Sequence, residues 1–290
     1  MGGSGVRIAA SRACRIIGDS HRNGRAGVVG WRDPRDQEEV GEAISGGCAP
    51  VSLLMLVHNE APVIERVVRD YHREVIDRLP GSEFILVEDG SRDGTTEILE
   101  RLRGELGLTV IHRDERRGYT AALRDGLSIP KHDLVFFSDA DGQHDPRDFW
   151  KLANRVRTAD LVIGVKSPRR DPWYRLAISR VFNALIAAMF GLRLSDINSG
   201  FRLMTRRLVD DLLRDEWRLR ACIASELTIR AHDKGYAIAE VPVRHLSRPF
   251  GGSKGLPLSR IPRAVVHIVR ELLVLRRLQR AGRLDGRPRP

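Results

Sequence analysis

The stretch Phe136-Phe137-Ser138-Asp139-Ala140-Asp141-Gly142-Gln143-His144-Asp145-Pro146 decides how the rest of the chain is interpreted. An apolar run, residues 133–138, is a candidate buried strand that leads directly into two acids spaced by one residue. Where a strand ends and the chain turns, an Asp-x-Asp pair can direct both carboxylates at one cation. Carboxylates and the Gln143 carbonyl suit Mg²⁺ or Mn²⁺, which prefer oxygen ligands. The alternative is a polar loop that caps the next helix, with Asp145-Pro146 at its start.

The first half of the chain alternates between strand and helix patterns. The expected strands are 51–57, 83–87, 108–112 and 133–138, and the expected helices are 61–78, 96–103 and 118–127. This alternation predicts a mainly parallel, doubly wound sheet of the α/β class. In such sheets, ligands bind beyond the carboxyl ends of the strands. Polar clusters fall at three of those ends: His58-Asn59-Glu60, Glu88-Asp89-Gly90-Ser91 and Asp139-Ala140-Asp141.

The second half is less regular. We expect strands at 161–165 and 237–243, a polar turn at 196–202 that leads into a helix, and helices at 173–190, 224–234 and 261–280. Residues 51–257 are predicted to form a single nucleotide-binding domain. Residues 1–50 are rich in Gly, Arg and Ser and lack sustained periodicity, which predicts a disordered extension. Residues 258–290 are predicted to form a basic amphipathic helix and tail.

The positive charge is concentrated at the C-terminus. The chain of 290 residues has a formal net charge of +11, and residues 244–290 hold 12 Lys plus Arg against 2 Asp plus Glu, a net of +10. A basic block of this kind favours a polyanionic partner such as an anionic membrane, phosphates or nucleic acid. Nucleic acid is disfavoured, because the charge is confined to one end and no basic motif with interleaved aromatic residues is present.

The cysteine content favours a reducing compartment. Three scattered cysteines form neither a metal-binding spacing nor a disulfide framework, so a cytosolic location is expected. The chain has no apolar run of 18 residues, and its best stretch, residues 184–192, is too short to span a bilayer. We therefore expect a cytoplasmic protein that lies peripherally at the cytoplasmic face of a membrane.

Five motifs occur in an order that resembles the family-2 glycosyltransferases of GT-A fold. Among these, the chain is most similar to the polyprenol-phosphate (dolichyl-phosphate) mannosyltransferase-like branch, over residues 51–275. The motifs are Val57-His58-Asn59-Glu60, Glu88-Asp89-Gly90-Ser91-Arg92-Asp93-Gly94-Thr95, the Ser138-to-Pro146 stretch, Ser199-Gly200-Phe201-Arg202, and Arg248-x-x-Gly251-x-Ser253-Lys254. The last two motifs point to the lipid-phosphate branch more than to other branches.

The resemblance implies a role for each matching residue. It implies a nucleotide-sugar site made by Leu56, His58, Asn59, Glu60, Val87, Glu88, Asp89, Asp139, Ala140 and Lys166. It implies metal ligands at Asp139, Asp141 and Gln143, and phosphate contacts from Arg248 and Lys254. Catalytic roles are expected for Asp141, and, from the chemistry of the reaction, for Arg202 and Glu226. The family usually has Pro, Tyr and Arg in place of Leu56, His58 and Lys166, so base identity and donor stay open.

The expected chemistry depends on the acceptor. A divalent ion can neutralise the charge that develops on a nucleotide-diphosphate leaving group. A lipid phosphate is already an anion near neutral pH and needs no general base, whereas an alcohol needs a carboxylate to take its proton, and Glu226 is the candidate. The alternatives are that Arg202 makes a structural ion pair and that Glu226 is a solvated helix acid.

The sequence thus predicts an inverting, metal-dependent transferase that moves a hexose, mannose from GDP-mannose, to a polyprenyl phosphate. The rival prediction is a GT-A transferase that uses a UDP-sugar or another donor on a soluble or natural-product acceptor. Helix 261–280 either packs on the domain or lies on anionic lipid. A partner protein that supplies a membrane anchor is a further expectation.

Overall fold

The computed structural model describes residues 49–169, 173–220, 222–247, 261–282 and 284. Residues 1–48 of the predicted N-terminal extension therefore lie outside the described residues. The strands are β1 (Val51–Val57), β2 (Glu83–Glu88), β3 (Thr109–Ile111), β4 (Leu134–Asp139), β5 (Leu161–Lys166), β6 (Phe201–Thr205) and β7 (Ile238–Val243). The α-helices are α1 (Ala61–Tyr71), α2 (Thr95–Leu106), α3 (Tyr119–Leu127), α4 (Phe149–Ala153), α5 (Trp173–Phe190), α6 (Arg206–Leu213), α7 (Ile223–Asp233) and α8 (Ile261–Arg280).

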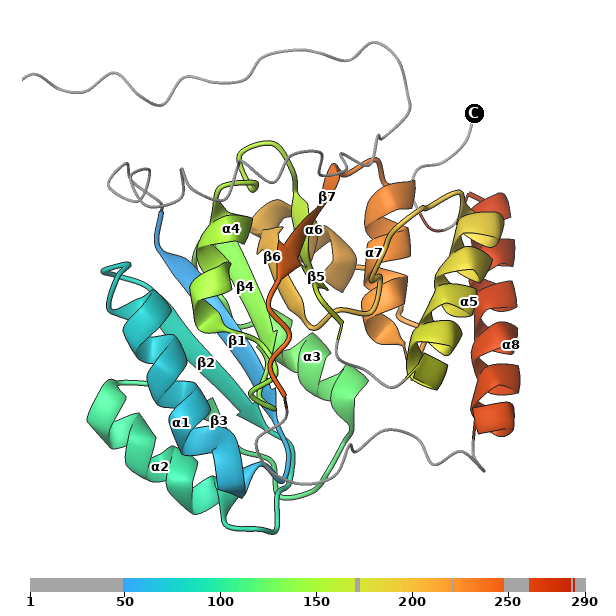
Figure 1. Ribbon diagram of the computed structural model, residues 1–290. Helices are drawn as coiled ribbons and strands as arrows, with labels where there is room; N and C mark the ends of the chain where they lie inside the picture. The colour runs from blue at the N-terminus through green and yellow to red at the C-terminus, as the bar shows by residue number, and fades with distance from the viewer. Residues whose placement is uncertain (1–48, 170–172, 221, 248–260, 283, 285–290) are drawn as a thin grey trace, which may run out of the picture.

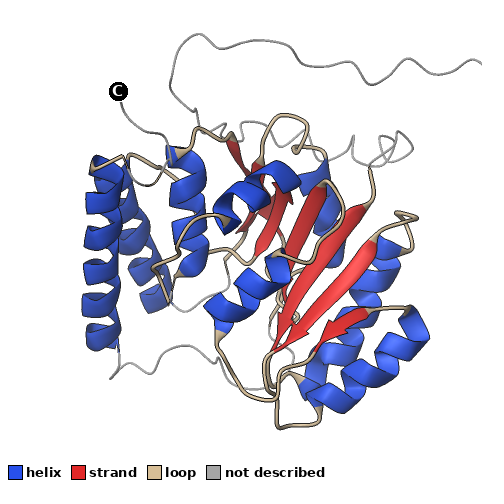
Figure 2. Cartoon of the chain, turned by 180° about the vertical axis from the view of Figure 1, so that it is seen from behind, coloured by secondary structure: helices blue, strands red, loops and turns tan. Residues whose placement is uncertain are grey.

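The strands form one sheet between two layers of helices (Figures 1 and 2). Their order is β3-β2-β1-β4-β6-β5-β7, and every described pairing is parallel except those of β6. Successive residues of β1 point to opposite faces, so Leu53 and Met55 enter one core while Leu54 enters the other. Burial on both faces explains why the strands are nearly continuous apolar runs. The predicted α/β class with a mainly parallel, doubly wound sheet is confirmed.

Each face of the sheet has its own core. Helices α1, α2 and α4 pack on one face, and α3, α6 and α7 pack on the other. Beyond α7, α5 and α8 run side by side at the edge of the molecule (Figures 1 and 2). Leu272 and Leu275 of α8 are fully buried in the second core together with Ile186 of α5. Helix α8 therefore packs on the domain along one face.

The prediction for residues 196–202 was wrong in part, because strand β6 follows the polar turn. Phe201–Thr205 pairs antiparallel with both β4 and β5, which places it inside the sheet. The strand is only five residues long, and its Phe201 and Leu203 face one core while Met204 faces the other. An alternation of apolar and polar positions over only five residues, between a polar turn and a helix, is too short to identify a strand from sequence.

The end of the first helix also differs from expectation. The helix expected over 61–78 ends at Tyr71 and continues as a π-helical turn over His72–Ile76. A 3₁₀ turn, Pro146–Asp148, and the short helix α4 follow the acidic stretch, and Asp145 caps the turn by accepting a hydrogen bond from the Arg147 backbone N–H at 3.0 Å. Asp145 therefore caps the next helical turn, as the alternative interpretation predicted, whereas Asp139 and Asp141 do not cap it.

Among the described helices, none combines the length and apolar character needed to cross a bilayer.

Candidate active site

The carboxyl ends of β1, β2 and β4 bring the three polar clusters together, as parallel strands require. Leu56 of β1 pairs with Asp139 of β4, and Val57 pairs with Glu88 of β2. Sequence positions up to 83 residues apart therefore meet at one edge of the sheet. Lys166, at the end of β5, lies close enough to Asp139 to influence its charge.

The Asp139-Ala140-Asp141 turn is built around close backbone packing. The Asp139 N–H donates to the Gly200 carbonyl at 3.1 Å, and a Cβ atom at Gly200 would lie 1.9 Å from Asp139 Oδ2. Glycine is required there because the carboxylate occupies the space that any side chain would need. On the other side of the turn, the Gln143 N–H donates to Asp141 Oδ1 at 3.0 Å.

The electrostatics of this turn fit a divalent cation. Burial, followed by the charge of Asp141, raises the pKa of Asp139 to about 7, although Lys166 and a hydrogen bond from Tyr119 oppose the rise. Two carboxylates held together with little countercharge, beside an amide, form a donor set for a hard cation. The described residues contain no cluster of three His, Cys, Asp or Glu side chains able to hold a metal. A cation here would therefore complete its coordination with phosphate or water oxygens.

The loops after β1 and β2 are joined by their own polar residues. Asn59 has a positive φ of 54°, its N–H donates to Ser91 Oγ at 2.9 Å, and its Oδ1 accepts from the Arg92 N–H at 2.8 Å. The Glu60 N–H donates to Thr95 Oγ1 at 3.0 Å. These contacts explain the spacing of both motifs, because each loop supplies the partners of the other.

Glu88 and Asp89 are buried and hold neighbouring loops. Glu88 accepts from the Ser91 N–H at 2.5 Å. Asp89 accepts from the N–H groups of Arg117 and Gly118 at 2.9 and 2.8 Å, just before α3. Burial alone would raise the pKa of Asp89, but these N–H groups and the Arg113 guanidinium lower it overall.

The remaining predicted nucleotide contacts differ in access. Leu56, His58 and Lys166 are half-buried at the edge of the sheet. The side chains of Val87 and Ala140 are buried, and Val87 belongs to the second core, so Val87 can meet a ligand only through its backbone. Arg248 and Lys254 lie outside the described residues.

Arg202 does not fit the predicted catalytic role. Its side chain lies on β6, is 3% exposed, and donates to the carbonyls of Ser199 and Ala224 at 2.6 and 2.9 Å. It also donates to Thr228 Oγ1 at 2.8 Å and to the Ile197 carbonyl. Burial lowers its pKa to about 10. The guanidinium thus fastens the turn before β6 to α7, through hydrogen bonds rather than an ion pair.

Glu226 does not fit the predicted role of a general base either. It is fully buried in the first turn of α7 and accepts from the backbone N–H groups of Arg218 and Leu219 at 2.8 and 2.5 Å. The Arg230 guanidinium donates to its other oxygen at 2.8 Å. A carboxylate with both oxygens engaged by the protein cannot take a proton from an acceptor in this arrangement.

Two side chains near the carboxylates were missed from the sequence. The Tyr119 hydroxyl, at the start of α3, donates to Asp139 Oδ1 at 3.3 Å. The Gln143 amide lies 3.3 Å from His245 Nε2, and residue 245 bridges to residue 144 beside β7. Neither contact follows from local sequence, since each joins segments at least 20 residues apart. Two sequence features could have indicated these side chains: Gly118, which marks the start of the helix that holds Tyr119, and the position of His245 just after a strand.

Two proteins with similar sequences have names that specify polyprenol or undecaprenyl phosphate. Polyprenol monophosphomannose synthase of Mycolicibacterium smegmatis is 29% identical over 223 residues, which cover 70% of this chain and 79% of that protein. Undecaprenyl-phosphate 4-deoxy-4-formamido-L-arabinose transferase of Salmonella choleraesuis is 28% identical over 207 residues, covering 70% of this chain and 62% of that protein. The chain thus spans less than two thirds of the second relative.

Solved structures support the fold. Glucosyl-3-phosphoglycerate synthase of Mycobacterium tuberculosis, in complex with Mn²⁺, UDP-glucose and phosphoglyceric acid, superposes with a TM-score of 0.63 at 22% identity. The match covers 90% of this chain and 88% of that one. The family described as Glycosyl transferase family 2 matches residues 52–213, more than half of the chain. The carboxylate pair at the sheet edge, the motif order and this match lead to one conclusion: the chain belongs to glycosyltransferase family 2.

Proposed function

We propose that this enzyme transfers a hexosyl unit, mannose from GDP-mannose, to a polyprenyl phosphate with inversion at the anomeric carbon. The observation that carries the proposal is the half-buried Asp139–Asp141 pair beside Gln143, at the sheet edge of a family-2 glycosyltransferase. The acceptor class is supported by similarity to relatives whose names specify polyprenol and undecaprenyl phosphate.

The first requirement of the reaction is a stabilised leaving group. Asp139, Asp141 and Gln143 would hold Mg²⁺ or Mn²⁺, which when bound neutralises charge on the departing diphosphate. Lys166 adds a positive charge on the same edge of the sheet, since it acts on the charge of Asp139. The Tyr119 hydroxyl keeps the Asp139 carboxylate oriented through its hydrogen bond.

The second requirement is a nucleophile. An oxygen of the acceptor phosphate attacks the anomeric carbon, and the bond from that carbon to the diphosphate oxygen breaks. The nucleoside diphosphate leaves as an anion. Since the phosphate carries no proton that must be removed, no base is needed, which agrees with the engagement of both Glu226 oxygens by the protein.

We also place the enzyme at an anionic membrane surface. Helices α5 and α8 expose large apolar side chains on the outer edge of the molecule, here called the α5–α8 face: Ile178, Val181, Val265, Val266, Leu273 and Val274. Exposed arginines, including Arg270 and Arg277, are interleaved with them on α8. Apolar side chains with basic neighbours suit the boundary between headgroups and acyl chains. A membrane-anchoring partner protein stays a prediction.

The proposal is tested by a donor and acceptor screen. Purified full-length protein is incubated with Mn²⁺ or Mg²⁺, a short polyprenyl phosphate, and a panel of GDP- and UDP-sugars, and lipid products are read by mass spectrometry. We expect a mannosylated lipid phosphate from GDP-mannose, lost in Asp141→Ala. Asp141→Ala removes a metal ligand without touching the contact between Asp139 and Gly200.

Other outcomes separate the alternatives. A product only from a UDP-sugar would change the donor and leave the acceptor in place. Metal-dependent nucleotide binding without any lipid product would contradict the acceptor and favour the rival prediction of a soluble or natural-product acceptor.

A further inference from the structure

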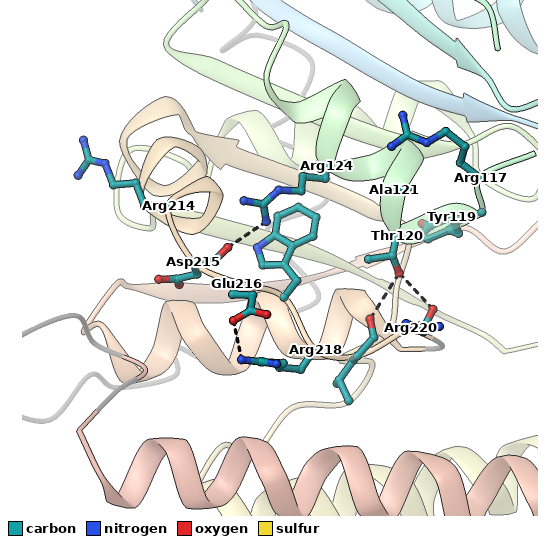
Figure 3. Close-up of a pocket in the computed structure, with 13 residues that line it drawn as sticks. Arg117, Tyr119, Thr120, Ala121, Arg124, Arg214, Asp215, Glu216, Arg218 and Arg220 are labelled. Carbon is teal, nitrogen blue, oxygen red and sulfur yellow. Dashed lines mark hydrogen bonds and ion pairs between the residues drawn. The ribbon is translucent and has the colours of Figure 1, made fainter.

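A cleft rich in arginine lies beside the carboxylate site, and none of its arginines has a part in the mechanism above. It has a volume of about 840 Å³ and lies between the first turns of α3 and the loop that joins α6 to α7 (Figure 3). Five of its lining residues are arginines: Arg117, Arg124, Arg214, Arg218 and Arg220. Its two lining acids are Asp215 and Glu216.

Both acids are already neutralised by the protein. Asp215 lies 3.2 Å from Lys234 Nζ and 3.4 Å from the Arg230 guanidinium, two cations with side chains no more than 6% exposed. Glu216 accepts a hydrogen bond from Arg218 at 2.5 Å (Figure 3). The arginines therefore outnumber the charges that balance them, and the cleft carries excess positive charge.

The walls of the cleft are held in place. Arg124 donates to the carbonyls of Leu213 and Asp215 at 2.7 and 2.9 Å, and its guanidinium lies 4.9 Å from the centre of the Trp217 ring. Thr120 Oγ1 donates to the Arg220 carbonyl at 3.1 Å, which ties α3 to the loop. The buried Glu226 holds the same loop from behind. A site whose walls are ordered in advance loses less entropy on binding.

The arginines divide into two groups by role. The guanidinium of Arg124 is engaged in hydrogen bonds to the loop that it supports. The guanidinium groups of Arg117 and Arg214 are open to solvent, with side chains 62% and 79% exposed, and Arg220 is also exposed. Arg117 lies 3.3 Å from the Asp125 carboxylate, and Arg214 lies 3.8 Å from the Asp211 carboxylate. Both contacts are made by exposed arginine side chains, so these guanidinium groups can exchange them for a ligand.

We propose that this arginine cleft is a binding site for a phosphate group. Guanidinium groups match the oxygens of phosphate in charge and geometry, and several of them together suit its double charge. The first N–H groups of α3 lie in the same wall, where the helix dipole favours an anion. Tyr119 lines the cleft and donates to Asp139, so the site adjoins the transfer centre. The proposal holds whichever sugar is transferred.

The test measures binding without the transfer reaction. Full-length protein in EDTA is titrated by calorimetry with inorganic phosphate and, separately, with farnesyl phosphate, a soluble prenyl phosphate. The test variant is Arg214→Ala with Arg220→Ala. The matched control is Arg73→Ala with Arg103→Ala, which removes two exposed arginines outside the cleft. Circular dichroism of each variant checks the fold.

We expect saturable binding that weakens at least about tenfold in the cleft variant, equivalent to about 1.4 kcal/mol, and stays unchanged in the control. Binding of both probes identifies free phosphate as sufficient, and binding of farnesyl phosphate alone identifies a lipid-borne phosphate. Trp217 emission should change on binding, and Trp217→Phe should abolish that change. Equal affinities in the two double variants, or no saturable binding of either probe, would overturn the proposal whatever the transfer assay gives.

Discussion

At the scale of single residues, Asp139 is the side chain on which the contacts of the site converge. Its backbone N–H is held by Gly200, its Oδ1 accepts from Tyr119, and its charge is balanced in part by Lys166. A residue with so many constraints has little freedom to move. Small changes next to it should therefore affect ligand binding more than they affect folding.

Gly200→Ala tests this constraint. The new Cβ would lie within 1.9 Å of the Asp139 carboxylate, so the carboxylate must leave its position. We expect Mn²⁺-dependent binding of nucleoside diphosphate to weaken by about tenfold or more, because a displaced ligand costs metal affinity on this order. Calorimetric titration of the nucleotide, with and without Mn²⁺, measures the effect.

Gly104→Ala provides the matched control. Gly104 lies within α2, and a Cβ there meets nothing within 4 Å. Alanine in a helix is favoured over glycine by about 0.5–1 kcal/mol, so this variant should be as stable as the parent or more so, with unchanged binding. If Gly200→Ala bound nucleotide as well as Gly104→Ala, Asp139 would have no role in holding the metal.

The residues of the site were predictable to different degrees. The carboxylates could be found because they directly follow an apolar strand, and the chemistry of an Asp-x-Asp pair is visible in the sequence. The contacts of Tyr119 and His245 could not be found, since they depend on how distant segments pack. Catalytic roles were predicted for Arg202 and Glu226 from the chemistry of the reaction, whereas their burial and hydrogen bonds give them structural ones.

At the scale of elements, β6 joins the two halves of the sheet. The parallel strands β1, β2 and β4 could be predicted because each is a long apolar run followed by a helix. Strand β6 could not, because its direction is set by its antiparallel neighbours β4 and β5 rather than by its own five residues. The turn before it is secured to α7 by Arg202.

Arg202→Met tests whether that link is structural. Methionine fills a similar volume but leaves the carbonyls of Ile197 and Ser199 without their donor, whereas the Ala224 carbonyl still accepts from Thr228 Oγ1 at 2.8 Å. Each buried group left unsatisfied costs about 1–3 kcal/mol, so we expect the free energy of unfolding to fall by about 2 kcal/mol or more. Urea denaturation measures the change.

The exposed Arg193 offers a control for the same substitution. Arg193→Met should change the free energy of unfolding by no more than about 0.5 kcal/mol, as surface substitutions usually do. An Arg202→Met protein that kept full stability while losing transfer activity would restore the predicted catalytic role of Arg202.

At the scale of the whole molecule, the two ends of the sheet carry different kinds of side chain. The Asp139–Asp141 pair and the polar loops after β1 and β2 lie at the edge formed by β1, β2 and β4, while the α5–α8 face lies at the far end of the sheet beyond α7 (Figure 1). The exposed arginines of α8, Arg270, Arg277 and Arg280, place basic side chains on that same end. Such an arrangement allows a membrane-bound substrate to reach a site built on a water-facing domain.

The double variant Val266→Asp with Leu273→Asp tests the α5–α8 face. Both side chains are about half exposed, at 52% and 48%, and point away from the buried Leu272 and Leu275, so the substitutions should leave the core intact. We expect partitioning onto vesicles of anionic phospholipid to fall by about tenfold or more, because the variant loses apolar contact and gains charge that the lipid repels. Vesicle co-sedimentation measures the partition coefficient. The control, Thr109→Asp with Thr158→Asp, adds the same charge at exposed positions away from this face. Since general repulsion acts on both variants alike, a selective loss in the first assigns membrane contact to the α5–α8 face, and equal losses would remove that assignment.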